Sequence, residues 1–425
     1  MTQGSLRHTT AQPVLGVRNG SAIRPEVADM MTRDPSDTAP RVALMAVELG
    51  RMQRGFERFF SGLFESVRDK IDITLYQGGG TSDARRRIPG MLGVTTALAR
   101  KLPLGSHTGG SFYKGDCMAF GICVLPELLR QRYDVIHCID PPLAKMLVRF
   151  RTNCGLRSRL IFTEGCAAPI EHYPKVDHIH QVAEVAFRNA IRAGVPESHM
   201  TMIPLGMHTG RFNSTATRQE LRAKHGISEA TLVILAISAL DRVHKRVDYI
   251  IEETSQLQGD FLLWIDGHLI DPTLPELARQ KLGSKCRVTH VPTEDIPELY
   301  RLADIMVHAS LDEAFGLAMV EAVCSGLRVI THNSPHFEWL LQSREWAVDM
   351  RVPGNLAARL QLAAAQSKEG SLPPPAAAES VGRRFDWATL APEYVAMYHK
   401  VSGFKTTAAG AELRKDNRAV TILDE

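Results

Sequence analysis

Two glutamates in the second half of the chain, Glu313 and Glu321, have seven residues between them and flank a small turn, Phe315-Gly316-Leu317. The turn opens a predicted helix that ends at Gly326, before an apolar strand at Arg328–Thr331. A turn that leads into a helix offers free backbone N–H groups and a positive dipole end, which together suit a phosphate. The glutamates on either side can accept hydrogen bonds from hydroxyl groups. A ligand with a sugar, a diphosphate and a ribose in line, a nucleotide sugar, would satisfy all three features.

An ordinary structural interpretation exists for the same residues, with Asp312 and Glu313 at a helix start and Glu321 on a solvated face. The whole block nevertheless resembles the signature of the retaining glycosyltransferases of family four, which have the GT-B fold. The matched positions are Ser310, Glu313, Phe315, Gly316, Leu317, Glu321, Ala322, Gly326, Val329 and Ile330. The resemblance implies an α/β protein with two Rossmann-like, doubly wound domains that face a central cleft.

The resemblance also implies roles for these residues in a retaining transfer from a nucleotide-diphosphate sugar. Glu313 would hold sugar hydroxyls or support the positively charged sugar carbon. Glu321 would accept hydrogen bonds from the ribose hydroxyls. Phe315, Gly316 and Leu317 would belong to the donor site, with the amides of Gly316 and Leu317 facing the diphosphate. The sequence leaves open whether Glu313 attacks covalently or the acceptor attacks from the same face.

A basic loop within Ser238–Ile250 contains Arg242, Lys245 and Arg246, between an apolar strand and a predicted helix. Cations at such a junction suit a diphosphate, and a solvated basic turn is the structural alternative. The loop resembles the family's donor-phosphate element, with Lys245 and Asp248 at its Lys and Asp positions. Lys245 and Arg242 would then stabilise the leaving group. Arg246 replaces a Gly that is usual in the family, and we expect a structural or surface role for it.

Two further segments resemble elements of the family. Ile203–Phe212 resembles the hinge between the two domains, which would place Gly206 near the donor. Glu48–Arg58 is the first βα loop, where the family has a glycine-rich loop near the donor phosphates. Gly55 is the best match to it, and Arg51 is a candidate for contact with an acidic acceptor.

Candidates for the acceptor side are polar residues of the first domain. Glu164 follows a predicted strand, at a position where many relatives carry a His that faces the reacting sugar. His172 is another candidate, and a structural or exposed role remains the alternative for any single His. Metal-dependent sugar transferases usually show D-x-D at a strand end, and Asp266-Gly267-His268 lacks the second acid. The sequence therefore predicts no metal requirement and no other cofactor.

Composition agrees with an enzyme of two domains. The chain has 425 residues, of which 44% are hydrophobic, 23% charged and 6% aromatic, with a net charge of +3. This charge is too small to indicate nucleic-acid binding. The seven cysteines form no C-x-x-C pair, and neither a signal peptide nor a membrane span is visible, so we expect a cytoplasmic protein. The basic cluster Arg85–Arg87 beside apolar residues leaves peripheral contact with the inner membrane open.

Apolar strands alternate with helical segments twice along the chain, which is typical of two doubly wound domains. The predicted strands are Val42–Val47, Ile73–Tyr76, Asp134–Cys138, Leu160–Thr163, Val233–Ile237, Phe261–Ile265, Val288–Val291, Ile305–His308 and Arg328–Thr331. Among the predicted helices are His180–Gly194, Lys245–Gln256 and Ile296–Ala303. The predicted organisation is a flexible tail at 1–40, an acceptor-side domain at 41–205, a nucleotide-sugar-binding domain at 206–384, a helix at 385–403 that crosses back to the first domain, and a flexible tail at 404–425.

Three other functions share this fold. A phosphorylase would need a lysine for pyridoxal phosphate, and no matching motif is visible. A nucleotide-sugar epimerase would need no acceptor. A non-catalytic scaffold or binding protein of a polysaccharide assembly system would bind without turnover. For the transferase, the acceptor could be a glycan, a lipid or a small molecule, and the donor a UDP- or GDP-sugar.

Overall fold

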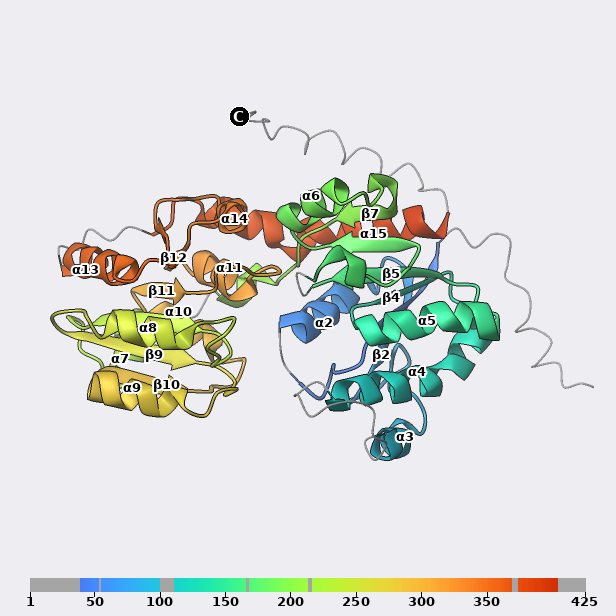
Figure 1. The fold of residues 1–425 in the computed structure, drawn as a ribbon, viewed down its shortest axis with the longest axis horizontal. Helices are drawn as coiled ribbons and strands as arrows, with labels where there is room; N and C mark the ends of the chain where they lie inside the picture. The colour runs from blue at the N-terminus through green and yellow to red at the C-terminus, as the bar shows by residue number, and fades with distance from the viewer. Residues whose placement is uncertain are drawn as a thin grey trace, which may run out of the picture. The chain divides into compact units, whose positions relative to one another are not determined.

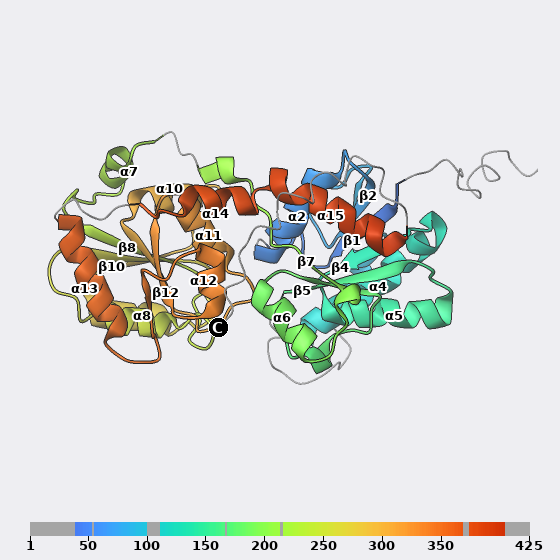
Figure 2. The ribbon, with the colours of Figure 1, turned by 90° about the horizontal axis from the view of Figure 1, so that it is seen from above.

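Two parallel β-sheets, each with helices on both faces, organise the protein (Figures 1 and 2). The computed structural model describes residues 39–52, 55–99, 111–165, 168–212, 216–368 and 374–403, and contacts place Ala39–Glu425 in one compact unit. The first sheet has seven strands in the order β3-β2-β1-β4-β5-β6-β7, and the second has six in the order β10-β9-β8-β11-β12-β13. The predicted doubly wound α/β architecture is confirmed.

The strands of the first sheet are β1 (Arg41–Ala46), β2 (Asp72–Gln77), β3 (Arg86–Arg87), β4 (Val135–Cys138), β5 (Arg159–Glu164), β6 (His178–Gln181) and β7 (Met200–Met202). Those of the second are β8 (Leu232–Ile237), β9 (Phe261–Asp266), β10 (Cys286–Thr289), β11 (Ile305–His308), β12 (Arg328–His332) and β13 (Ala347–Val348). Every strand predicted from the sequence overlaps one of these.

The α-helices are α2 (Gly55–Val67), α3 (Leu92–Ala99), α4 (Ser111–Gln131), α5 (Pro141–Cys154), α6 (Glu184–Arg192), α7 (Arg218–Lys224), α8 (Val247–Thr254), α9 (Leu274–Leu282), α10 (Ile296–Leu302), α11 (Leu317–Cys324), α12 (Pro335–Leu341), α13 (Asn355–Lys368), α14 (Ala378–Phe385) and α15 (Trp387–Ser402). Short 3-10 helices are η1 (Ile170–His172), η2 (Glu197–His199), η3 (Thr209–Phe212) and η4 (Gly283–Lys285). In the described part of the chain, none of the helices has the length and apolar character needed to cross a bilayer.

Alternation along β1 explains why helices cover both faces of the first sheet. Val42 and Leu44 belong to a core shared with α2 and α15, whereas Ala43 and Met45 belong to a core shared with α4 and α5. Successive side chains of a strand point to opposite faces, so an uninterrupted apolar strand requires cover on both sides. The first of these cores continues into α11 and one face of the second sheet, which makes it common to both sheets.

Helix α15 lies against α2 and the first sheet. Asp386 caps its N-terminus by accepting a hydrogen bond from the Ala388 N–H at 2.8 Å. The Trp387 ring stacks on Phe59 of α2, with ring centroids 5.9 Å apart. Near the end of the helix, the Tyr398 hydroxyl reaches His137 of β4 at 2.9 Å. The last helix of the described chain is thus bound to the first sheet.

A line of hydrogen bonds through the buried first sheet is satisfied by neutral histidines. His180 Nε2 can only donate to the Ile203 carbonyl at 2.8 Å, so its Nδ1 accepts from the Thr163 hydroxyl at 2.9 Å. The Thr163 oxygen then accepts from His137 Nε2 at 2.6 Å, and His137 Nδ1 accepts from the Tyr398 hydroxyl. A second proton on either ring would force its hydroxyl partner to stop donating to that ring, and burial disfavours the added charge.

Acid should therefore destabilise the fold before its carboxylates titrate. Burial lowers the pKa of His180 to about 4 and that of His137 well below its ordinary value. An unfolded histidine binds a proton near pH 6.5, so stability is complete above that pH and falls as the pH decreases toward 4. Each histidine contributes a slope of about 1.4 kcal/mol per pH unit. Urea unfolding at several pH values measures this slope.

A matched pair of variants isolates the contribution of a buried histidine to the pH dependence of the unfolding free energy. His180→Gln removes a buried titrating ring and should give a shallower dependence of the unfolding free energy on pH. His199→Gln removes an exposed ring and should leave the dependence unchanged. Equal slopes in the two variants would contradict the proton arrangement described above.

The structure corrects two predicted helices. The prediction of a helix over His180–Gly194 is wrong at its start, because His178–Gln181 forms β6 between β5 and β7, and the helix begins at Glu184. The histidines of β6 are buried and hydrogen-bonded, and the sequence pattern gave no sign of this. The helix predicted from Lys245 begins at Val247, since Arg246 has a left-handed backbone with φ +50°.

The predicted domain organisation is not tested by the contacts, which do not divide the chain near residue 205. The predicted tails at 1–40 and 404–425 lie outside the described residues, apart from Ala39 and Pro40.

Candidate functional site

Lys245 and Glu313 follow neighbouring strands of the second sheet. β8 leads into the loop that holds Lys245, β11 leads into the turn that holds Glu313, and the two strands pair in parallel. Carboxyl ends of parallel strands meet at the same edge of a sheet, which is where such folds bind ligands. The two residues form an ion pair although they are 68 positions apart in the sequence.

Glu313 is the centre of a cluster that also contains Lys245, His308 and Ser310, here called the Glu313 cluster. One carboxylate oxygen of Glu313 contacts Lys245 Nζ and accepts from His308 Nε2 and Ser310 Oγ, each at 2.8 Å. The Glu313 side chain is 13% exposed. Burial raises the pKa of Glu313, but the His308 ring and the Lys245 ammonium outweigh it and hold the pKa well below its ordinary value. This carboxylate is therefore ionised at neutral pH.

The turn after Glu313 requires glycine where it enters α11. Gly316 has φ +105°, and a Cβ there would lie 2.2 Å from Met319 Cε. Leu317, the first residue of α11, is half-buried, and the first N–H groups of a helix have no acceptor within it. The predicted turn and helix start are present. They place the first backbone N–H groups of α11 close to the Glu313 cluster in the sequence.

Phe315 lies in the core. It is 1% exposed, and its ring packs edge-on against Phe385 with centroids 5.4 Å apart. Its carbonyl accepts a hydrogen bond from His336 Nε2 at 2.8 Å. These contacts fix the position of the turn at Gly316, so Phe315 supports the site through the residues that it packs against.

Glu321, one turn into α11, is buried between two partners. One carboxylate oxygen forms an ion pair with Arg58 of α2, and the other accepts from the Tyr300 hydroxyl at 3.0 Å. The Glu321 side chain is only 3% exposed, against 30% for Arg58. Burial, followed by the nearby charge of Arg211, lowers the pKa of Arg58.

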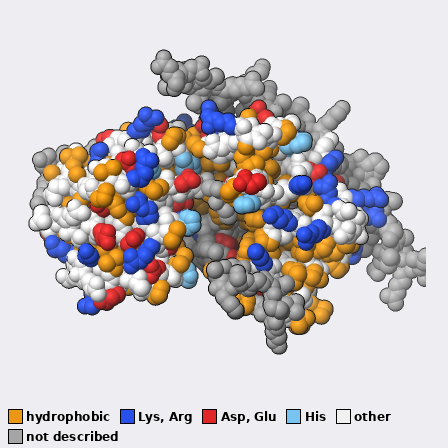
Figure 3. Space-filling view, viewed as in Figure 1, with side chains coloured by type: hydrophobic (Ala, Val, Ile, Leu, Met, Phe, Trp, Pro, Cys, Tyr) orange, Lys and Arg blue, Asp and Glu red, His pale blue; other side chains and the backbone are white. Residues whose placement is uncertain are grey.

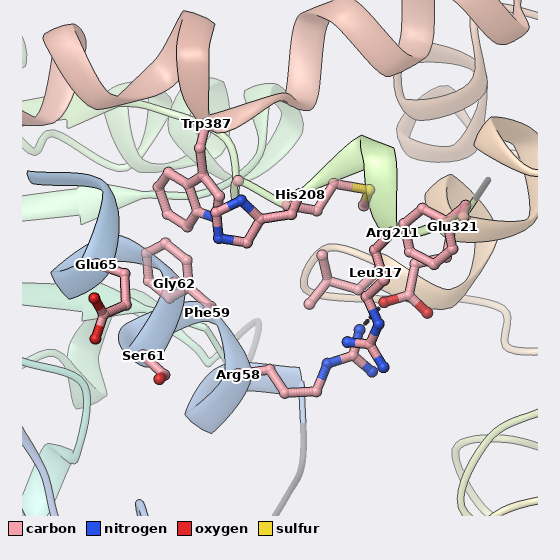
Figure 4. Close-up of a pocket in the computed structure, with 13 residues that line it drawn as sticks. Arg58, Phe59, Ser61, Gly62, Glu65, His208, Arg211, Leu317, Glu321 and Trp387 are labelled. Atoms are coloured by element: carbon pink, nitrogen blue, oxygen red, sulfur yellow. Dashed lines mark hydrogen bonds and ion pairs between the residues drawn. The ribbon is translucent and has the colours of Figure 1, made fainter. Parts of the chain in front are cut away.

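Arg58 and Glu321 lie in a pocket of about 260 Å³, here called the hinge pocket. Its walls come from α2, the segment Gly206–Phe212, the start of α11 and Trp387. In Figure 4 the guanidinium groups of Arg58 and Arg211 point toward Glu321, and the rings of Trp387 and Phe59 lie at the other end. The pocket thus combines a cationic end with an aromatic end.

Gly206 lines the hinge pocket with a backbone that leaves no room for a side chain. A Cβ at Gly206 would meet the Trp387 ring at 2.5 Å. Gly55 begins α2, and a Cβ there would lie 3.4 Å from a methyl group of Leu317. Both glycines expected near the donor therefore lie beside the hinge pocket or the start of α11.

The two arginines of the basic loop point to other partners. Arg242 Nε donates to Asp271 at 2.7 Å and its NH2 donates to Thr273 at 2.8 Å, so it is not joined to the Glu313 cluster. Arg246 donates to the carbonyls of Ala309 and Met350 at 3.3 and 3.0 Å. Arg246 therefore has the structural role expected for it, and it connects the basic loop to the segment after β11.

The acceptor-side candidates are not joined to one another by the contacts of the structure. Arg51 donates to the Gly78 carbonyl at 2.7 Å. Glu164 is 2% exposed and accepts from the Ala168 N–H at 3.2 Å, which makes it part of its own loop. His172 lies exposed at the end of η1. Their predicted contact with an acceptor stays a prediction.

Sequence reasoning missed several residues that complete the site. His308 is the last residue of a predicted strand. Ligands bind at the carboxyl ends of parallel strands, so this position could have marked His308 as a site residue. Arg58, Arg211, Tyr300 and Trp387 come from separate elements, and no local pattern marks them. Within the described ranges, no group of three His, Cys, Asp or Glu side chains is arranged to hold a metal ion.

Comparison with known proteins finds a family match over the region of the second sheet. A family model for "Glycosyl transferases group 1" matches residues 217–369. Mannosylfructose-phosphate synthase of Agrobacterium fabrum is 32% identical over 149 residues, covering 31% of this chain and 32% of that protein. Lipopolysaccharide glucosyltransferase WaaG of Escherichia coli is 30% identical over 138 residues, covering 31% and 36%. The chain thus spans about a third of the length of these curated relatives.

Solved structures match most of the chain at low identity. HepE of Anabaena, solved in complex with UDP and glucose, has a TM-score of 0.63 at 15% identity, covering 84% of this chain and 99% of that one. Sucrose-phosphate synthase of Thermosynechococcus elongatus has a TM-score of 0.70 at 15% identity, covering 86% and 100%. At this identity the likeness shows a common fold, with both sheets included.

Proposed function

We propose that this chain, which matches the group 1 glycosyl transferases over residues 217–369 and has the GT-B fold, transfers a hexosyl group from a nucleotide-diphosphate sugar to an acceptor, with retained configuration. The observation that carries the proposal is the Glu313 cluster beside the N-terminus of α11. Lys245, Glu313 and Glu321 all fall inside the matched segment 217–369.

Lys245 and the start of α11 suit the leaving group. When the bond between the sugar and the diphosphate breaks, negative charge grows on the diphosphate. An ammonium group and helix N–H groups already in place stabilise that charge without reorganisation. Lys245 supplies the cation, and the N–H groups of Gly316 and Leu317 supply the donors. We propose that the reaction requires no metal ion, with Lys245 providing the positive charge.

Glu313 suits the sugar. Its carboxylate is ionised, and one of its oxygens is fixed by Lys245, His308 and Ser310. Positive charge that develops at the anomeric carbon would be stabilised by this carboxylate. In a same-face reaction, the acceptor oxygen forms the new bond as the diphosphate departs, and the acceptor proton passes to a diphosphate oxygen. Retention of configuration follows from that geometry.

Glu321 suits the ribose hydroxyls, on one condition. Its carboxylate already has Arg58 and Tyr300 as partners. A ribose that donates to Glu321 must therefore replace or share the Arg58 contact. Donor binding would then change the ion pair between α2 and α11.

The finer identity of the substrates also belongs to the proposal. We take the donor to be a UDP- or GDP-sugar and the acceptor to be a glycan, a lipid or a small molecule. HepE, which shares the fold, was solved with UDP and glucose. Cytoplasmic location is supported by the cysteines, since Cys117, Cys123, Cys138, Cys154, Cys286 and Cys324 all carry free thiols.

Two other functions make different predictions for the same site. A binding or scaffold protein would bind a nucleotide sugar without turnover, or bind none. An epimerase would convert the donor sugar with no acceptor present. The ionised carboxylate with a lysine beside it favours a reaction in which a diphosphate leaves.

Thermal unfolding with a panel of UDP-, GDP- and ADP-sugars tests the proposal. One donor should raise Tm, because a ligand at a hundredfold excess over its Kd stabilises the folded state by about 2.7 kcal/mol. Glu321→Gln should reduce the shift, whereas Glu338→Gln, on α12, should retain it. If no nucleotide sugar raises Tm in the wild type, the transferase proposal fails. Release of nucleotide diphosphate from the stabilising donor then separates turnover from binding.

A further inference from the structure

A second cavity, of about 440 Å³, lies at the amino end of the second sheet. The strands β11 and β12 begin at its wall, whereas the Glu313 cluster lies at the carboxyl ends of β8 and β11. The cavity is therefore at the opposite edge of the sheet from the proposed reaction, and it is here called the rear pocket. The residues of its wall that matter below are Arg218 of α7, Tyr300 and Arg301 of α10, Asp304, Ser325 and Arg328.

Positive charge is concentrated in the rear pocket. On the face shown in Figure 3, basic and acidic side chains are interspersed over the half that contains the second sheet. In the rear pocket, one oxygen of Asp304 pairs with Arg218, and the other pairs with the fully buried Arg222 at 2.6 Å. Two guanidinium groups thus share one carboxylate. The other acid of the wall, Glu229, is exposed, so water and salt screen its charge.

Two further arginines of the wall are available to an anion. Arg301 is exposed, and it makes no hydrogen bond or ion pair with any other residue that the structure describes. The Arg328 side chain is 6% exposed, lies over the Trp346 ring, and pairs at 2.8 Å with Glu345, which is 61% exposed. A pair with such an exposed partner contributes little, so phosphate oxygens can replace the glutamate. A guanidinium group binds phosphate through paired N–H groups.

Two elements connect the rear pocket to the hinge pocket. Helix α11 begins at Leu317, in the wall of the hinge pocket, and is followed by Ser325, in the wall of the rear pocket. Tyr300 lines the rear pocket, and its hydroxyl donates to Glu321 at 3.0 Å. The Tyr300 ring also packs edge-on against Phe212 of the hinge pocket, with centroids 6.2 Å apart. A ligand that shifts α10 or the end of α11 therefore changes the surroundings of Glu321.

We propose that the rear pocket binds a sugar monophosphate, and that this ligand changes the affinity of the protein for its donor. Arg301 and Arg328 would bind the phosphate, while Glu229 and Ser325 would contact sugar hydroxyls. A cavity of about 440 Å³ has the size of a small-molecule site, and inorganic phosphate would leave most of it unfilled. The binding site does not depend on the proposed function, and only the effect on the donor rests on it.

Isothermal titration calorimetry with glucose 6-phosphate, in the absence of any nucleotide, tests the site. The wild type should bind glucose 6-phosphate more tightly than inorganic phosphate, and should not bind glucose. Arg301→Gln should weaken the binding by about tenfold or more, because a charge-assisted hydrogen bond is lost. Arg279→Gln, which replaces a 72% exposed arginine of α9, should bind like the wild type.

Lys245→Met distinguishes the rear pocket from the donor site, where a phosphate could also bind. This variant should bind glucose 6-phosphate like the wild type. Binding that Lys245→Met loses and Arg301→Gln retains would place the phosphate in the donor site and overturn the proposal. No binding by the wild type, or equal binding by the wild type and Arg301→Gln, also overturns it. Inorganic phosphate that binds as tightly as glucose 6-phosphate would reject a sugar monophosphate as the ligand.

The effect on the donor is measured by titrating the stabilising nucleotide sugar with and without saturating glucose 6-phosphate. The Kd of the wild type for the donor should change by about fivefold or more. Tyr300→Phe removes the hydroxyl that contacts Glu321, so it should bind glucose 6-phosphate normally and lose most of this change. An unchanged donor Kd in the wild type would reject the regulatory role. If glucose 6-phosphate binds in the rear pocket and no nucleotide sugar binds at all, the proposed function fails while the binding site is supported.

Discussion

Replacing Glu313 with glutamine is expected to lower kcat for nucleotide release by about a hundredfold or more, with a smaller change in KM for the donor. Glutamine keeps the size of the side chain and still accepts from Ser310. It removes the negative charge that faces Lys245 and, in the proposed reaction, the sugar carbon. The positive charge on the sugar carbon exists mainly in the transition state, so the loss of its stabilisation by Glu313 should appear in kcat. Steady-state release of nucleotide diphosphate from the donor measures it.

Asp312→Asn is the matched control. Asp312 is the neighbouring acid of the same turn, but its side chain is exposed and accepts from the Glu313 N–H at 2.9 Å. The control should retain most of the activity. If Asp312→Asn and Glu313→Gln lose activity equally, the effect comes from the shape of the turn, and the role of the Glu313 charge is wrong.

Lys245→Met addresses the other half of this ion pair. The ammonium helps to hold the pKa of Glu313 below its ordinary value, so its removal affects both the leaving group and the carboxylate. The double variant should then lose less than the sum of the two single losses, because residues that act as a unit are not additive. Additive losses would place the two residues in separate steps.

The parts of the site that the sequence predicted are those held by local patterns. The turn at Gly316 needs a glycine for its left-handed backbone, and the strands on either side are short apolar runs. The ion pair between Lys245 and Glu313 was not predicted, although each residue was expected at the donor site and both follow strands of one parallel sheet. These features depend on residues near one another in the sequence, or on the topology of a parallel sheet.

The parts that could not be predicted depend on contacts between distant segments. Arg58 is an ordinary surface-type residue of α2 until α11 lies beside it, and nothing near it in the sequence indicates a carboxylate partner. The strand β6 was missed because its alternating histidines are polar, and only burial between two strands explains them. Arg246 was expected to be structural, but its left-handed backbone was not, since such a conformation is uncommon for arginine.

Arg58→Ala is expected to lower the stability of the nucleotide-free protein and to increase its response to the donor. Without Arg58, the Glu321 carboxylate loses its ion-pair partner and keeps the Tyr300 hydroxyl, and breaking a buried pair in this way costs about 3 kcal/mol. Ribose hydroxyls would supply the missing partners. The donor should therefore raise Tm more in Arg58→Ala than in the wild type, although the variant begins lower.

Arg188→Ala serves as the control for Arg58→Ala, because Arg188 is 65% exposed and pairs with Glu184 on the surface of α6. Such a pair contributes less than about 1 kcal/mol, so neither Tm nor the donor shift should change appreciably. A donor shift in Arg58→Ala that is no larger than the wild-type shift would mean that the ribose does not reach Glu321. The Arg58–Glu321 pair would then join α2 to α11 without a part in donor binding, and the donor hydroxyls would need another acceptor.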